Sequence, residues 1–185
     1  MHFRIRHGDQ VDSTLILTAL AVDLEGNKEV LALRACAAED KEGWLSLLQD
    51  VRTRGATQFD LIVTDGHDGL LAAVAQLFTA TPRQRCLVHK QRNVLTAIPR
   101  RERSEVAAEL VAIWQQRSKE EAIVQLAAFK AKYGKRYPEA VRSLAEEEEK
   151  TLTFYAFPAA MQRSIQTTNA IESLAEQHQA AHRSD

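Results

Sequence analysis

The stretch "LIVTDGHDGL", residues 61–70, places two carboxylates and an imidazole where a short apolar run ends in a glycine-containing turn. The run predicts a buried strand, and the apolar spacing after the turn predicts a helix. Ligands and metal ions bind at the carboxyl edge of such sheets, so Asp65 is a candidate metal ligand with His67 and Asp68 beside it. A structural role fits the same residues: Asp65 caps the next helix, or Asp68 caps a helix that starts at Gly69.

Cys86 and His89, within "QRCLVHKQRN", have the spacing of half a zinc site. Zinc takes four protein ligands, or three and a water molecule. The other cysteine, Cys36, lies far away in the sequence, so a structural zinc ion is not expected. The pair is interpreted either as a feature near a metal site or in contact with DNA, or as a packed core cysteine.

Asn169 and Glu172, within "TTNAIES", have the spacing of a capping box. In that motif the first side chain and the later glutamate satisfy backbone amides at the start of a helix. On the residues alone this structural reading is favoured, and a role of Glu172 as a metal ligand is the alternative.

Basic residues concentrate in one part of a chain whose net charge is −1. Residues 80–117 contain eight lysines and arginines against three glutamates, a local charge of +5. Such a segment suits the DNA backbone, although solvent-exposed helices carry similar runs. The four glutamates at 146–149 are interpreted as a solvated helix face. The candidate DNA contacts are Arg83, Arg85, Lys90 and Arg92, with Arg100, Arg101 and Arg103 extending the surface.

The elements that would position these residues follow the order βββαβαβ, then a helical block, then a closing helix. Apolar stripes support two helices of the block, one through Val106, Leu110, Ile113 and Trp114 and one through Ile123, Leu126 and Ala127. Strands are expected at 2–6, 14–22 and 29–35 in an antiparallel meander, followed by a helix at 40–54. A strand ending at Asp65, its helix and a strand at 85–89 come next. Helices are expected over 90–149 with Gly134 and Pro138 at the joins, then an irregular connection at 151–158 and a last helix near Asn169. This order predicts an α/β protein with a ribonuclease H-like mixed sheet and an all-helical insertion.

The composition is that of a soluble globular domain, with 45% hydrophobic and 26% charged residues. No apolar run approaches the roughly 18 residues of a membrane span, and the N-terminus has no signal-peptide pattern. Two cysteines provide no disulfide framework. A cytoplasmic protein is therefore expected, associated with the nucleoid when it is bound to DNA.

Taken together with "LTFY-x-FP", the motifs around Asp65, Cys86 and Glu172 closely resemble those of mutator-type transposases of bacterial insertion sequences, from about residue 3 to residue 174. The resemblance implies a ribonuclease H-like catalytic domain with an Asp-Asp-Glu triad, in which Asp65 matches the second aspartate and Glu172 the glutamate. It also implies two Mg²⁺ (or Mn²⁺) ions, double-stranded DNA of transposon ends and targets as partner, and a homo-oligomer. It places Cys86 and His89 at the last core strand, near the acidic site.

The implied chemistry explains why carboxylates are needed. DNA strand cleavage and transfer are in-line displacements at phosphorus, and two metal ions can clamp the attacking and leaving oxygens. Mg²⁺ prefers carboxylate oxygens and keeps several waters, so a few carboxylates from different elements suffice. Asp65 and Glu172 are therefore expected about 4–8 Å apart, given ions about 3.5–4 Å apart.

Three parts of the family pattern have no match in this sequence. The first triad aspartate lies on the first strand, just ahead of "HFRIR", whereas this sequence starts at Met1, and neither Asp9 nor Asp12 matches. The family's N-terminal DNA-binding region and basic C-terminal helix also have no counterpart. The expectation is a transposase catalytic domain that is inactive as this fragment, with a ribonuclease H-like core at 1–89, the helical insertion at 90–160 and a closing helix at 161–185. The alternatives are a DNA-binding or subunit-pairing module without catalysis and, with a replacement acidic residue, a stand-alone metal nuclease.

Overall fold

The computed structural model describes the backbone of residues 2–7, 10–169 and 171, and the side chains from Thr14 onward within these ranges. The chain divides into two compact units. The first unit runs to Thr81 and resumes at Thr168, and the second is Pro82–Thr167. The expected domain boundaries at residues 89 and 160 stay predictions.

The sheet of the first unit is the predicted antiparallel meander. Strands β1 (His2–His7), β2 (Gln10–Val22) and β3 (Lys28–Cys36) lie in the order β1-β2-β3. The β2–β3 turn closes because the Asp23 carboxylate accepts from the Asn27 amide, 2.7 Å away, and Gly26 adopts a φ of 88°. Asp, Gly and Asn are residue types that favour such turns.

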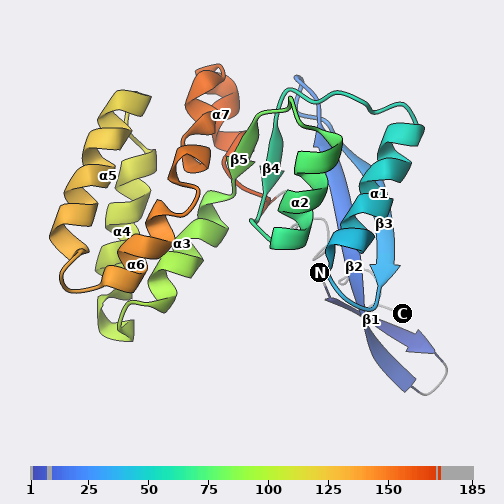
Figure 1. The fold of residues 1–185 in the computed structure, drawn as a ribbon, viewed down its shortest axis with the longest axis horizontal. Helices are drawn as coiled ribbons and strands as arrows, with labels where there is room; N and C mark the ends of the chain where they lie inside the picture. Colours follow the sequence, from blue (N-terminus) through green and yellow to red (C-terminus); the bar gives the residue numbers. More distant parts are fainter. Residues whose placement is uncertain (1, 8–9, 170, 172–185) are drawn as a thin grey trace. The chain divides into compact units, whose positions relative to one another are not determined.

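Helix α1 (Lys41–Thr53) packs against β2 and β3, and α2 (Asp68–Leu77) lies beside it (Figure 1). The carboxylate of Asp40 caps α1 by accepting from the Gly43 amide at 2.8 Å. The buried stripe of α1 is the one that the spacing predicts: Trp44, Leu47, Leu48 and Val51. The short strand β4 (Ile62–Thr64) leads into Asp65, as expected.

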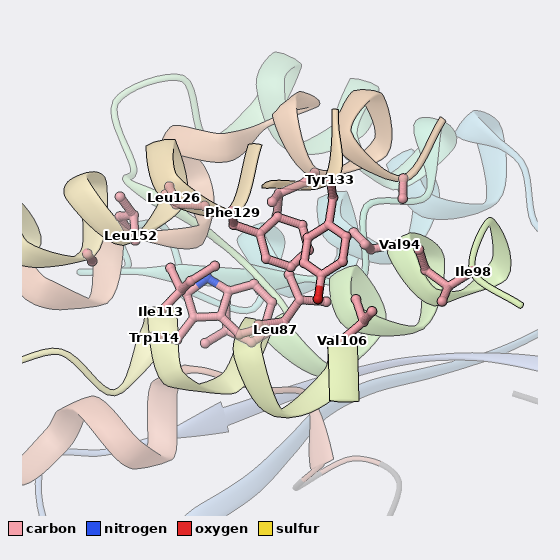
Figure 2. Packing of buried hydrophobic residues seen from close by; sticks show 14 of the residues in the cluster. Leu87, Val94, Ile98, Val106, Ile113, Trp114, Leu126, Phe129, Tyr133 and Leu152 are labelled. Atoms are coloured by element: carbon pink, nitrogen blue, oxygen red, sulfur yellow. The ribbon is translucent and has the colours of Figure 1, made fainter. Parts of the chain in front are cut away.

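The second unit is built almost entirely from helices. Figure 2 shows its core, in which Leu87, Val106 and Leu126 pack with aromatic side chains. The helix Lys119–Tyr133 is capped by Ser118, whose hydroxyl accepts from the Glu121 backbone amide. The helix Pro138–Ala145 begins with a proline, which is favoured at a first helical position. The elements are β5 (Arg83–Arg85), α3 (Leu87–Thr96), η1 (Arg100–Glu102), α4 (Arg103–Trp114), α5 (Lys119–Tyr133), α6 (Pro138–Ala145), η2 (Glu148–Thr151), η3 (Thr153–Ala156) and α7 (Ala159–Ile165).

The strand expected at 85–89 is wrong in part. Strand β5 ends at Arg85 and helix α3 begins at Leu87, so His89 lies on a helix. Leu87, Lys90 and Val94 are buried at a spacing of three and four, which is the helical period. A run as short as "CLVH" does not distinguish the two periods, and the packing of this face decided for the helix.

The stripe expected on α5 is also wrong in part. Ile123 is 47% exposed and Ala127 is exposed, whereas Leu126 is buried with a different set of neighbours. The buried face of α5 is turned by one residue from the predicted stripe, so that the small Ala122 and the rings of Phe129 and Tyr133 lie in the core. The buried residues are Ala122, Leu126, Phe129 and Tyr133. The stripe of α4 is confirmed: Val106, Leu110, Ile113 and Trp114.

The predicted α/β class is confirmed, and the helical character of residues 90–149 is confirmed. The expected irregular connection at 151–158 contains the short 3₁₀ helix η3. No helix in the described part of the chain is both long and apolar enough to cross a bilayer.

Candidate catalytic and DNA-binding residues

Asp65 lies in the turn between β4 and α2, in the first unit. Its Oδ1 accepts from the backbone amide of His67 at 3.0 Å, and Gly66 supplies the positive φ of 88° that this turn needs. The carboxylate is partly buried. The turn therefore holds Asp65 with one oxygen bonded to the backbone that follows it.

The two capping alternatives for this stretch resolve differently. Helix α2 begins at Asp68, with His67 as the residue before its first turn. Asp68 is thus inside the helix and exposed, which corrects its expected capping role. Its charge lies at the positive end of the helix. Asp65 is not the N-cap of α2. Its carboxylate accepts from the backbone amide of His67, which is the N-cap residue.

His67 faces an acidic residue that the sequence reasoning did not single out. Nδ1 of His67 lies 3.7 Å from Oε1 of Glu39, and the Trp44 indole donates to that same oxygen at 3.2 Å. Glu39 lies between β3 and α1, so its place just after a predicted strand was the available signal. Nothing else in the sequence separates it from an ordinary surface carboxylate.

A complete metal site is not assembled by the described residues. No three His, Cys, Asp or Glu side chains of the described residues gather closely enough to hold an ion. Glu172 lies outside the described residues, and Asn169, just before it, has helical backbone. The expected Asp65–Glu172 distance stays a prediction. Asp65 offers the hard oxygen that Mg²⁺ prefers, and a single carboxylate is one ligand of several.

Cys86 immediately precedes α3 and His89 lies in its first turn, in the second unit. Sγ of Cys86 and Nδ1 of His89 are 3.1 Å apart, and the cysteine is completely buried. This supports the reading of Cys86 as a packed core residue. Cys36, in the first unit, has its thiol 3.7 Å from the Leu15 carbonyl oxygen.

Lys90 is not at the surface, although it was expected to contact DNA. Only 3% of it is exposed, and its ammonium donates to the carbonyl oxygens of Ser143 at 2.6 Å and Glu146 at 2.5 Å. These carbonyls lie at the end of α6, where a cation is favoured. Burial, and secondarily the positive charge of Arg85, lowers the pKa of Lys90. In this arrangement Lys90 joins α3 to α6 and does not present its charge to a phosphate.

The arginines of β5 hold Glu147, which corrects the interpretation of the glutamate run as a solvated helix face. Arg83 Nη2 and Arg85 Nε lie 2.5 and 3.5 Å from the two carboxylate oxygens of Glu147. Glu147 has a left-handed backbone with a φ of 57°, and Glu148 pairs with Lys130 at 2.8 Å. Local sequence could not identify these partners because the pairs join residues that are distant in the chain.

Replacing Glu147 with alanine is expected to lower the free energy of unfolding by about 1–2 kcal/mol, because two arginines lose their shared anion in a partly buried setting. Glu147→Gly should lose less, since glycine adopts this φ without penalty. Urea unfolding followed by circular dichroism measures both. The exposed Glu149→Ala is the control, expected within about 0.5 kcal/mol of wild type. Equal effects of Glu147→Ala and Glu149→Ala would contradict the pairing.

The remaining basic candidates are exposed. Arg92, Arg100, Arg101 and Arg103 all lie on the surface of the second unit. Arg103 donates from Nε to the Ile98 carbonyl oxygen, which orients it, and the Arg101 side chain is 81% exposed and pairs with Glu102 at 3.3 Å. The basic segment is therefore divided between internal ion pairs and a surface set.

The family model described as "Transposase, Mutator family" matches residues 1–184. The chain belongs to the Mutator family of transposases. The transposase for insertion sequence element IST2 of Acidithiobacillus ferrooxidans is 37% identical over 159 residues, which cover 85% of this chain and 54% of that protein. The transposase for IS6120 of Mycolicibacterium smegmatis is 36% identical over 94% of this chain and 53% of its own length.

A third relative extends the comparison to a longer protein. The transposase for ISRM5 of Rhizobium meliloti (strain 1021) is 32% identical over 94% of this chain and 44% of its own length. The chain thus spans about half the length of the relatives that it matches. The Mutator-family resemblance predicted from the motifs around Asp65, Cys86 and Glu172 is confirmed by these matches.

Proposed function

We propose that this Mutator-family domain takes part in metal-dependent DNA strand cleavage and transfer, in cut-and-paste or copy-type transposition. The observation that carries the proposal is the Asp65 carboxylate, held at the end of β4 by the His67 amide. A carboxylate positioned by its own turn needs no reorganisation when it binds a cation. Family membership makes DNA the expected substrate.

The proposed site combines Asp65 with Glu172 on a ribonuclease H-like fold. Bound Mg²⁺ or Mn²⁺ would polarise the reacting phosphate and stabilise the attacking and leaving oxygens of an in-line displacement. Asp65 would supply one hard oxygen ligand, and Glu172 a second from a later element of the chain. His67 has a supporting part, since its amide orients Asp65. Assembly of two or more copies on transposon ends is part of the same proposal.

Metal binding by the purified chain tests this function directly. Titration with Mn²⁺, followed by the loss of its free electron paramagnetic resonance signal, should show saturable binding. Nicking of supercoiled plasmid DNA in the presence of Mg²⁺ or Mn²⁺ would extend the result to chemistry. Absence of saturable Mn²⁺ binding up to millimolar concentration would overturn the assignment of Asp65 as a metal ligand.

A second candidate function is DNA or subunit binding without catalysis. The exposed arginines of the second unit favour it, because their side chains lie at the surface, where phosphates can approach. Such binding would be insensitive to base sequence and strongly dependent on salt.

Removing Arg100 and Arg101 together is expected to weaken DNA binding and to reduce the slope of log K against log salt by about 1–2, since each phosphate contact contributes about 0.9 to that slope. Fluorescence anisotropy with a labelled duplex between 50 and 200 mM salt, the range that resolves such slopes, provides the measurement. The matched control removes two exposed cations from β3, Lys28→Ala with Arg34→Ala. An equal change in the control would exclude a localised DNA surface at Arg100 and Arg101.

A further inference from the structure

We infer that Glu39 is a positioning residue for Asp65, acting through His67 and anchored by Trp44. The inference rests on the proposed metal site and adds to it a residue that no motif singled out. Glu39 comes from the β3–α1 connection, whereas Asp65 follows β4, so the link joins two separate loops of the first unit.

The backbone amide of His67 orients the Asp65 carboxylate. Oδ1 accepts from the backbone amide of His67 at 3.0 Å. Any displacement of His67 therefore moves the donor that fixes this oxygen. Gly66, with its left-handed φ, is the only residue between them, so the turn brings this donor to Oδ1. A contact from outside the turn can add to this restraint by holding the His67 side chain.

Glu39 provides a contact with His67 from outside the turn. The His67 ring is partly buried, and its Nδ1 has no hydrogen-bond partner among the described residues. Oε1 of Glu39 lies 3.7 Å from this nitrogen, too long for a hydrogen bond but within electrostatic contact. That oxygen is itself fixed, because the Trp44 indole donates to it at 3.2 Å and Trp44 is part of the core of the first unit.

The backbone also brings the two loops together. Gly69, in the first turn of α2, lies directly against the backbone next to Glu39: a Cβ there would be 2.8 Å from the Asp40 carbonyl carbon and 2.9 Å from the Lys41 nitrogen. The start of α2 thus abuts the start of α1. The two loops are packed together, and the contact between Glu39 and His67 is one part of that packing.

The consequence is a carboxylate whose direction is set before a cation arrives. Groups that orient a metal ligand commonly change metal affinity by about 10- to 100-fold when they are removed. Glu39 would act through an electronegative oxygen that the Trp44 indole holds beside His67, which a neutral amide oxygen can also supply. Glutamine keeps an oxygen acceptor at this position, so Glu39→Gln should preserve the function and Glu39→Ala should not.

Amide hydrogen exchange at His67, measured by NMR on the full chain, tests the positioning itself. In Glu39→Ala the protection of this amide should fall by about five- to tenfold, because the electrostatic contact with His67 and the Trp44–Glu39 hydrogen bond that fixes it are both lost. Glu39→Gln should stay within about twofold of wild type, and so should the exposed control Glu42→Ala. Trp44→Phe, which keeps an aromatic side chain but removes the indole N–H donor, should change protection in the same direction as Glu39→Ala. Unchanged protection in Glu39→Ala would overturn the inference.

Mn²⁺ affinity separates positioning from direct ligation. Glu39→Ala should weaken Mn²⁺ binding about tenfold in the wild-type background and have no effect when Asp65 is replaced by asparagine. If Glu39→Gln loses Mn²⁺ binding as fully as Glu39→Ala while His67 protection is unchanged, Glu39 is a ligand and the positioning role is wrong. If wild type does not bind Mn²⁺, the proposed function fails, and hydrogen exchange at His67 alone decides whether Glu39 holds the turn.

Discussion

Asp65→Asn is expected to weaken Mn²⁺ binding by the chain at least about tenfold, and to lower any metal-dependent nicking of DNA by about 10²-fold or more. The substitution removes the negative charge and keeps the size of the side chain. The amide oxygen of asparagine can still accept from the His67 backbone, so the turn should persist. The loss would therefore report on metal ligation and not on folding.

The matched control is Asp60→Asn, an identical chemical change at an exposed residue a few positions before β4. It should leave Mn²⁺ affinity within about twofold of wild type, as expected for a surface substitution. Thermal unfolding of both variants verifies that they fold. If Asp65→Asn and wild type bind Mn²⁺ equally, Asp65 is not a ligand, and the local role of holding its own turn is the one that remains.

Gly69→Ala is expected to destabilise the first unit by about 3 kcal/mol. Helix propensity alone would give the opposite sign, since alanine stabilises a helix by about 1 kcal/mol relative to glycine. The added methyl group would meet backbone atoms of Asp40 and Lys41 at 2.8 and 2.9 Å, and backbone cannot move aside as a flexible side chain can. The start of α2 would have to shift away from α1, and with it the turn that contains Asp65.

Urea unfolding of the chain measures this effect, and Ala75→Gly calibrates it. Ala75 is exposed on the same helix, so its replacement should cost only the propensity difference of about 1 kcal/mol. A Gly69→Ala variant that is as stable as wild type, or more stable, would show that α1 and α2 do not approach as closely as described.

Local patterns in the sequence determined much of the architecture. The stripe from Trp44 to Val51 fixes which face of α1 is buried, and Gly134 and Pro138 lie at the end of α5 and the start of α6. Periodicity and turn chemistry act over a few residues, so they can be recognised in the sequence without a structure. The family can be recognised for the same reason: its motifs around Asp65, Cys86 and Glu172 are short stretches of sequence.

Periodicity was ambiguous where runs were short. "CLVH" became the start of α3 and not the end of a strand, because burial of Leu87 and Val94 on one face required the helical period. On α5 the sequence pattern chose Ile123, and packing selected Ala122 and Leu126 instead. In both places several residues were apolar enough to be buried, and the surrounding core decided among them.

Only the tertiary structure decided which charged groups meet. Lys90 reaches the carbonyl of Ser143, 53 residues away, and Arg83 reaches Glu147, so part of the basic segment is used inside the second unit. Glu39 meets His67 in the same way in the first unit. The sequence does not show which partner a charged residue has. The interaction energy of two charges depends on their distance and burial, and both are set by the packing of elements that lie far apart in the chain.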